Sequence, residues 1–254
     1  MGYLIAVTGK GGVGKTTISS LLIKQLIANG MEPVLAIDAD PNSCLDAALG
    51  VKAESTVGSA REEVRQEVQG GMSAGISKQE LLQLKIAESL VEARGFDLIA
   101  MGRPEGAGCY CYANNVLKSV ITEISNEYPY VVLDNEAGLE NLSRRIVQEV
   151  NMLVLISDPS NSGMETLKRL YTLSCEMNIK YDQLLLVINR IRNGKMPEKI
   201  EEVRAFTKAD HVLGLPDDGE IAAFAENNRS IFELQDDNEV LKKINDIIKS
   251  KLKK

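Results

Sequence analysis

The segment from Gly9 to Thr17 combines residue types and spacing that bind phosphate groups. Gly9, Gly14, Lys15 and Thr16 satisfy the pattern G-x-x-x-x-G-K-[ST]. In this pattern glycines let backbone N–H groups turn toward phosphate oxygens, the lysine reaches the β- and γ-phosphates, and the threonine hydroxyl ligates Mg²⁺. The sequence therefore predicts a site for a nucleotide with Mg²⁺. The residues expected to hold the phosphates are Gly9, Lys10, Gly11, Gly12, Val13, Gly14, Lys15, Thr16 and Thr17.

The same glycines also fit a dinucleotide-binding loop. Gly9, Gly11 and Gly14 spell G-x-G-x-x-G, and Asp38 ends the next expected strand about where a ribose-binding acid would lie. The Lys-Thr pair after the last glycine favours the phosphate loop, because a dinucleotide site does not need it.

Acidic residues follow two further apolar runs. Asp38 and Asp40 come at the end of "LAID", and Asp134 ends "YVVLD", with Gly138 four residues later. Ligands of open α/β sheets bind at the carboxyl ends of the strands, and carboxylates there can hold a metal shell or orient a water for phosphoryl transfer. Asp40 also precedes Pro41, so it could instead cap a helix.

The elements that must position these residues alternate along the chain. Apolar runs separated by segments of helical spacing predict a mostly parallel sheet of about seven strands with helices on both faces, in one α/β domain over residues 1–254. Together with the phosphate-loop motif, this predicts a P-loop NTPase domain. The expected strands are Tyr3–Thr8, Pro33–Asp38, Phe96–Met101, Tyr130–Asp134, Met152–Ser157, Leu184–Asn189 and His211–Leu215.

Helical spacing predicts two buried faces between the strands. Three segments are expected to be irregular: 51–59, 70–77 and 102–112. Residues 239–254 predict an amphipathic helix that packs on the domain, although a membrane-targeting helix would have the same pattern. The buried faces consist of Ile18, Leu21, Leu22, Gln25 and Leu26, and of Leu81, Leu84, Ile86, Leu90 and Val91.

Composition limits the classes of function. The 254 residues carry 29 Lys and Arg against 36 Asp and Glu, a net charge of −7, which argues against a generic nucleic-acid binder. No apolar run approaches the roughly 18–20 residues that span a membrane, and the first residues lack the features of a signal peptide. We expect a cytoplasmic globular protein.

Cys109 and Cys111 form a C-x-C pair in a glycine-rich segment. Such close thiols suit a soft metal better than a disulfide, and two pairs across a two-fold axis would supply four thiolates to Zn²⁺ or Ni²⁺. The alternative is that both are small buried side chains. Cys44 and Cys175 are expected to be packing residues, and His211 is assigned no role.

Lys10 identifies a family. The stretch "KGGVGKT" resembles the deviant phosphate loop of the family that contains MinD, ParA, the arsenite-pump ATPase and the nitrogenase iron protein. The resemblance implies an ATPase that hydrolyses ATP to ADP and phosphate and forms an ATP-dependent homodimer. In that dimer Lys10 would cross the interface and touch the partner's phosphates.

The resemblance assigns roles at further positions. It makes Asp38 and Asp40 the first switch, with Asp38 in the metal shell and Asp40 orienting the attacking water. It makes Asp134 the Mg²⁺-sensing acid of the second switch. The adenine base would be held by Asn189, Arg190, Leu215, Pro216 and Asp217.

The position of the C-x-C pair is similar to that in the ATPases that mature carbon monoxide dehydrogenase by nickel insertion. This narrower resemblance implies a metallochaperone with that enzyme as client. Two alternatives stay open: an iron-protein-like reductase with a bridging iron–sulfur cluster, and a spatial regulator of the MinD or ParA kind.

Overall fold

A single sheet runs through the part of the protein that the computed structural model describes, residues 2–70, 77–102, 122–138 and 149–252. Its strands are short, nearly continuous apolar segments, as expected for strands covered on both faces. The strands are β1 (Tyr3–Gly9), β2 (Val34–Asp38), β3 (Val91–Ala93), β4 (Phe96–Ala100), β5 (Tyr130–Ala137), β6 (Glu149–Ser157), β7 (Lys180–Ile191) and β8 (His211–Pro216).

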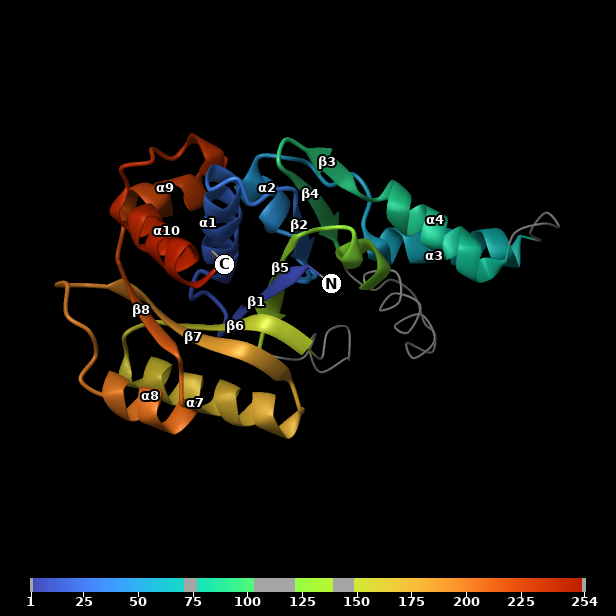
Figure 1. Ribbon diagram of the computed structural model, residues 1–254. Helices are drawn as coiled ribbons and strands as arrows, with labels where there is room; N and C mark the ends of the chain where they lie inside the picture. The colour runs from blue at the N-terminus through green and yellow to red at the C-terminus, as the bar shows by residue number, and fades with distance from the viewer. Residues whose placement is uncertain (1, 71–76, 103–121, 139–148, 253–254) are drawn as a thin grey trace.

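Within the described residues the strand order is β3-β4-β2-β5-β1-β6-β7-β8. Every neighbouring pair is parallel except β3 with β4, which are antiparallel. β1 is therefore central, between β5 and β6, and its carboxyl end leads into the phosphate loop (Figure 1). The predicted fold class, a mostly parallel sheet of an α/β protein, is confirmed. The additional strand is β3, whose three residues are too short to show a periodicity.

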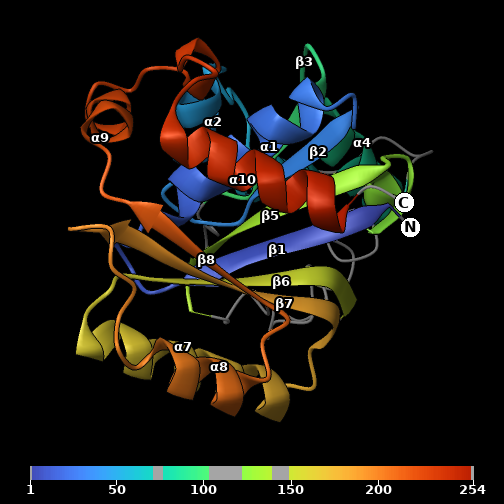
Figure 2. The same ribbon diagram turned by 60° about the vertical axis from the view of Figure 1, so that its left-hand side comes forward.

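Helices cover both faces of the sheet (Figure 2). On one face α1, α2, α9 and α10 bury one apolar cluster, and on the other α3, α4, α7 and α8 bury a second. The helices are α1 (Lys15–Ala28), α2 (Leu45–Leu49), α3 (Val57–Gln69), α4 (Lys78–Glu88), α7 (Asn161–Glu176), α8 (Ile200–Thr207), α9 (Gly219–Glu226) and α10 (Glu239–Lys251), with the short 3₁₀ helix η1 (Ile231–Glu233) before α10.

The predicted buried face of α1 is confirmed at all five positions. The predicted face around α4 is wrong in part. Leu84 is 50% exposed, and Val91 belongs to β3. The helix ends at Glu88, where the hydroxyl of Ser89 bonds to the carbonyl oxygen of Ile86. α4 packs on α3 and buries Leu81, Leu82 and Ile86, so Leu84 lies outside its buried face.

The expected irregular segment 51–59 contains the start of a helix. α3 begins at Val57, and the Thr56 hydroxyl accepts a hydrogen bond from the backbone N–H of Ser59. The Ser59 hydroxyl in turn accepts one from the N–H of Thr56, which completes a capping box. A capping box usually carries Glu or Gln at that third position, so the serine gives only a weak signal.

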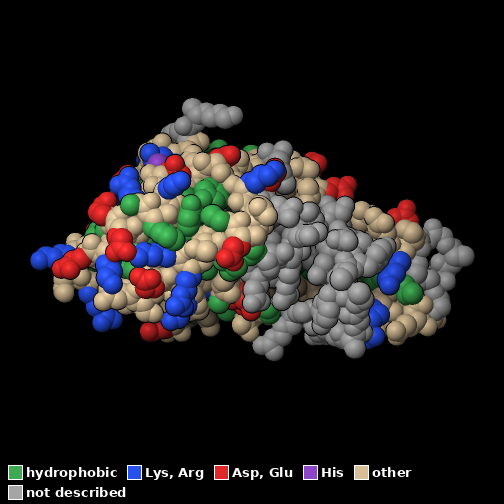
Figure 3. All heavy atoms as spheres, turned by 90° about the horizontal axis from the view of Figure 1, so that it is seen from below, with side chains coloured by type: hydrophobic (Ala, Val, Ile, Leu, Met, Phe, Trp, Pro, Cys, Tyr) green, Lys and Arg blue, Asp and Glu red, His purple; other side chains and the backbone are tan. Residues whose placement is uncertain are grey.

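The face formed by α7 and α8 is seen in Figure 3, where acidic and basic side chains surround a central group of apolar ones. Leu173 and Phe206 are among the exposed apolar residues, and the Phe206 ring meets Tyr171 edge-on at 5.9 Å between ring centroids. Charges of both signs are interspersed here, in keeping with their near-balanced numbers in the sequence.

The C-terminal helix α10 is docked on the domain, as predicted. Its apolar face, which includes Leu241, Ile244 and Ile248, is buried in the same cluster as α1. The Asn238 side chain caps its first turn, and the buried ammonium of Lys24 donates to the carbonyl oxygen of Leu234 just before it. Among the described residues, no helix has the length and apolar character needed to cross a bilayer.

Docking of α10 predicts a clear difference between two neighbouring isoleucines. Ile248 is fully buried, whereas Ile247 is partly exposed. Ile248→Ala should therefore lower the free energy of unfolding by about 2–4 kcal/mol. The matched Ile247→Ala change should cost less than about 1 kcal/mol. Urea unfolding followed by circular dichroism measures both, and equal small effects would contradict a docked helix.

Candidate functional site

The phosphate loop joins β1 to α1 and is fixed to the end of β7. Gly14 has φ +94°, and a Cβ atom there would lie 2.7 Å from the Asn189 side-chain nitrogen. That nitrogen donates a hydrogen bond of 2.9 Å to the carbonyl oxygen of Val13. Glycine is therefore required at this position for conformation and for space.

An open cavity of about 410 Å³ lies over this loop. The Lys15 side chain is buried beneath it, and within the described part of the chain its ammonium group donates one long hydrogen bond of 3.4 Å, to the carbonyl oxygen of Lys10. Lys15 is thus placed to reach phosphate oxygens in the cavity. The cavity is lined by Gly11, Gly12, Gly14, Lys15, Thr16, Asp40, Asn42, Glu136, Ala137 and Arg190.

Asp38, the last residue of β2, is paired with Asp134 of β5. Asp38 is fully buried, and its two carboxylate oxygens accept hydrogen bonds from the backbone N–H groups of Asp40 and Leu45, each 3.0 Å long. Burial raises the pKa of Asp38 to about 6, although these two hydrogen bonds oppose the shift. Asp38 therefore anchors the first switch region and leads the chain into α2.

Asp134 is 1% exposed and lies against the first turns of α1. One carboxylate oxygen accepts a hydrogen bond of 3.0 Å from the Ser19 hydroxyl, while the other has no partner among the described residues. Burial raises the pKa of Asp134 to about 7; the Asp38 charge adds to this, and the nearby hydroxyls of Thr16 and Ser19 oppose it.

These groups fit Mg²⁺. The donors are hard oxygens, the Thr16 hydroxyl and the carboxylates of Asp38 and Asp134, and one oxygen of Asp134 has no partner in the part of the chain that the structure describes. A bound divalent cation would remove the cost of burying these negative charges.

Asp40 does not cap a helix. One oxygen of its carboxylate accepts hydrogen bonds from the backbone and side-chain nitrogens of Asn42, at 2.9 and 3.1 Å, so it closes a turn around Pro41. α2 begins only at Leu45, and its first N–H is bound by Asp38 instead. The interpretation of Asp40 as a helix cap is therefore wrong.

Gly138 ends the described part of the second switch beside the phosphate loop. It has φ +92°, and its N–H donates to the carbonyl oxygen of Gly9 at 3.1 Å. The Thr8 hydroxyl donates to the carbonyl oxygen of Gly138. β1 and the second switch are thus held together next to the cavity.

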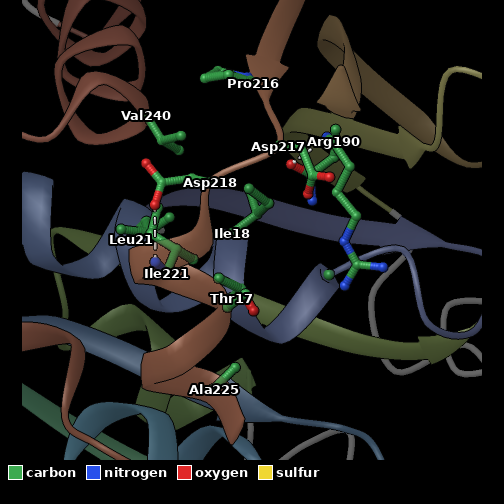
Figure 4. Close-up of a pocket in the computed structure, with 13 residues that line it drawn as sticks. Thr17, Ile18, Leu21, Arg190, Pro216, Asp217, Asp218, Ile221, Ala225 and Val240 are labelled. Atoms are coloured by element: carbon green, nitrogen blue, oxygen red, sulfur yellow. Dashed lines mark hydrogen bonds between the residues drawn. The ribbon is translucent and has the colours of Figure 1, made fainter. Parts of the chain in front are cut away.

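A second cavity lies over the amino end of α1 (Figure 4). Four of the five residues expected to hold the adenine base line it, and we call it the base cavity. Asn189, Arg190, Pro216 and Asp217 line it. Leu215 does not: its side chain is fully buried in the core beneath. Arg190 has φ +61°, lines both cavities, and reaches from β7 toward the start of α1.

Sequence reasoning missed several cavity residues. Apolar side chains from α1, α9 and α10 line the base cavity. In the sequence they cannot be distinguished from ordinary core residues. Asp218 caps α9 by accepting from the N–H groups of Glu220 and Ile221, and the Asp-Gly-Glu stretch could have indicated it. Glu136 lies within the second-switch pattern, which assigned roles only to its Asp and Gly. The missed apolar residues are Ile18, Leu21, Ile221, Ala222, Ala225 and Val240.

Lys10 is exposed at the rim of the loop. Hydrogen bonds from Ser160 hold the pKa of Asp158 below its usual range, and the nearby positive charge of Lys10 adds to this effect. The lysine therefore lies near Asp158, at the carboxyl end of β6.

The cysteines divide into two groups. Cys109 and Cys111 lie outside the described residues. Cys44 and Cys175 are exposed, so the prediction that they are packing residues is wrong. Cys44 lies in the first switch, and Cys175 is on the outer side of α7. Within the described ranges no group of three or more His, Cys, Asp or Glu side chains could hold a metal ion.

The burial of Asp134 predicts a stability that depends on pH in the absence of metal. Its pKa is higher in the folded than in the unfolded chain, so its ionisation destabilises the fold as pH rises from about 4 to 7. Asp134→Asn should therefore raise the unfolding free energy at pH 8 by roughly 2–4 kcal/mol. The gain should shrink toward zero at pH 4. Urea unfolding in EDTA at both pH values measures it, and no gain at pH 8 would contradict the burial argument.

Comparison with known proteins agrees with this geometry. A family model described as an AAA domain matches residues 3–185. An uncharacterized ATP-binding protein of Methanocaldococcus jannaschii is 42% identical over 248 residues, covering 96% of each chain. The carbon monoxide dehydrogenase accessory protein CooC of Rhodospirillum rubrum is 32% identical over 192 residues, covering 69% of this chain and 70% of CooC.

Among solved structures, the MinD cell division protein of Aquifex aeolicus superposes with a TM-score of 0.68 at 21% identity, covering 99% of this chain and 97% of that one, and thus shares the fold. Together with the phosphate loop on β1 and the switch acids on β2 and β5, these matches identify the chain as a member of the AAA_31 family of ATP-binding P-loop proteins, the MinD/ParA family.

Proposed function

We propose that this protein is an ATP-dependent metallochaperone that inserts nickel into carbon monoxide dehydrogenase. ATP binding closes a homodimer, which brings the C-x-C pairs of Cys109 and Cys111 together around Ni²⁺ or Zn²⁺. Hydrolysis then opens the dimer and releases the metal to the client enzyme. The observation that carries the proposal is the C-x-C pair in a chain 32% identical to a protein named as an accessory of that enzyme.

The nucleotide part of the proposal is supported by the two cavities over α1. Lys15 and the loop N–H groups hold the phosphates, Thr16 ligates Mg²⁺, and Asp38 and Asp134 lie in its shell. The base lies against Asn189 and the turn at Pro216 and Asp217. Bound Mg²⁺ supplies charge neutralisation to the developing phosphate negative charge.

The dimer part is supported by the placement of Lys10. Lys10 is exposed and is not among the residues that line the phosphate cavity, whereas the buried Lys15 lines it. The two lysines of the loop therefore differ in position, and the exposed one is accessible to the phosphates of a second copy. Metal and nucleotide binding are then linked, and each must change the other's affinity by the same factor.

This predicts that substituting the two lysines of the phosphate loop has different effects. Lys10→Ala should keep ATP affinity in the monomer within about threefold, but abolish ATP-dependent dimers and lower kcat at least tenfold. Lys15→Ala should lose nucleotide affinity itself. Light scattering with ATP and Mg²⁺ measures the dimer, and Lys195→Ala, at an exposed lysine in the turn after β7, is the charge control. A Lys10→Ala protein that still dimerises with ATP would contradict the assignment.

The metal site is tested by comparing two pairs of cysteines. Cys109→Ser with Cys111→Ser should abolish stoichiometric Ni²⁺ or Zn²⁺ binding in equilibrium dialysis with ATP, with nucleotide affinity retained. Cys44→Ser with Cys175→Ser changes the two thiols that are exposed among the described residues, and should leave one metal per dimer. Unchanged metal binding in the first variant would refute the site. A brown, iron-containing protein after anaerobic purification would instead favour the reductase alternative.

A further inference from the structure

A third cavity, of about 320 Å³, lies beside the two that we assign to the nucleotide. Its walls come from the amino end of α1, from the first switch with α2, and from α9 with the turn that leads into η1. This volume is at the lower end of the roughly 300–1,000 Å³ range of small-molecule pockets. The third cavity is therefore large enough for a small organic molecule.

A nucleotide does not need this space. Gly14 and Arg190 line both the phosphate cavity and the base cavity, so a nucleotide that occupies both would pass these two residues. Neither of them lines the third cavity, which shares Thr16 with the phosphate cavity and three side chains of α1 and α9 with the base cavity. The third cavity is thus a neighbour of the nucleotide site, with its own walls on α2 and beyond α9.

The lining of the third cavity selects for charge. Among the described residues that line it, Arg229 is the one charged side chain, and none is acidic. Apolar side chains, among them the buried Phe224 and Ile231, form one part of the wall, and hydroxyl groups of α1 and the first switch form another. A cation would meet no opposite charge there, whereas an anion with an apolar body matches the lining.

The Arg229 guanidinium is held in place but has donors to spare. It lies over the Phe224 ring, 4.0 Å from the ring centroid. Its Nε and Nη2 groups both donate to one oxygen of Glu233, at 3.2 and 2.9 Å, and within the described residues we find no partner for Nη1. Both side chains of this ion pair are more than half exposed, so the pair contributes little to stability. The remaining N–H groups suit the planar fork of a carboxylate.

We propose that the third cavity binds a small organic carboxylate with an apolar body, separately from the nucleotide. The carboxylate pairs with Arg229, and the body lies against Ile231 and the two alanines of α2, Ala47 and Ala48. Cys44 of the first switch lines the same cavity, so the ligand also contacts the segment that follows Asp40. Binding there is then linked to the conformation of the first switch.

The test uses hydrocinnamate, a phenyl ring on a short carboxylate chain, as the probe. Titration of the full chain followed by NMR should give a dissociation constant on the order of 1 mM, as expected for so small a ligand. The uncharged hydrocinnamamide should bind at least about tenfold more weakly. Saturating ADP with Mg²⁺ should change the affinity for hydrocinnamate by less than about threefold, because the nucleotide lies in the other two cavities.

The exposed cysteines locate the probe. Saturating hydrocinnamate should slow alkylation of Cys44 by iodoacetamide at least about threefold, measured at each cysteine by mass spectrometry. Cys175, exposed on the outer side of α7, is the internal control and should react at an unchanged rate. Equal protection of both cysteines, or of neither, would contradict the site.

Two variants test the chemistry of the cavity. Arg229→Gln should weaken hydrocinnamate binding at least about tenfold, whereas Arg65→Gln, at an exposed arginine of α3 that also pairs with a glutamate, should bind as wild type does. Ala48→Leu keeps Arg229 but fills the cavity, and should abolish binding. Thermal unfolding checks that each variant is folded.

The proposal is overturned if the amide binds as tightly as the carboxylate, if folded Arg229→Gln keeps its affinity within about threefold, or if ADP displaces the probe. A chain that binds hydrocinnamate with these properties but does not bind ADP would contradict the proposed nucleotide site and support this one.

Discussion

The structure depends on two carboxylates buried side by side. Asp38 and Asp134 occupy paired positions on adjacent strands in the middle of the sheet, and both are almost completely removed from water. Such a pair can exist only if hydrogen bonds, protons or a cation compensate for lost hydration. The backbone of the first switch supplies the hydrogen bonds to Asp38, and α1 supplies those to Asp134. Burying these two acids therefore lowers the stability of the fold at the point where phosphate and Mg²⁺ would bind.

The same constraint connects the two cavities. α1 presents its amino end to the phosphate cavity and carries Ser19 against Asp134, so the helix cannot shift without breaking that contact. The loop before α1 is held by Asn189 at the end of β7, which also lines the base cavity. A nucleotide that occupies both cavities therefore contacts elements that are already joined by hydrogen bonds, which reduces the conformational entropy lost on binding.

Much of this could be predicted from the sequence, because the signals are local. Each signal lies within a short stretch of sequence: the glycine and lysine spacing of the phosphate loop, the apolar runs that end in Asp38 and Asp134, and the amphipathic α10. What could not be predicted depends on tertiary contacts. The three residues of β3 form a strand because they pair with β4. Cys44 is exposed although the next residue, Leu45, is buried, and Leu215 is buried in the core while Pro216 and Asp217 line the cavity.

Glu136 illustrates the same limit in the site itself. A glutamate two residues after Asp134 would lie on the same face of a regular strand, yet the bulge against β1 places it at the phosphate cavity. Its presence changes the charge balance: Asp40 and Glu136 line the cavity with Lys15 and Arg190, and the buried acids Asp38 and Asp134 lie close to it on β2 and β5. Adding a triphosphate makes the imbalance larger. Mg²⁺ would offset part of it, and in the homodimer that we propose the exposed Lys10 of a second copy would offset more. In that proposal, neutralising the nucleotide favours closure of the dimer, and removal of the γ-phosphate weakens it.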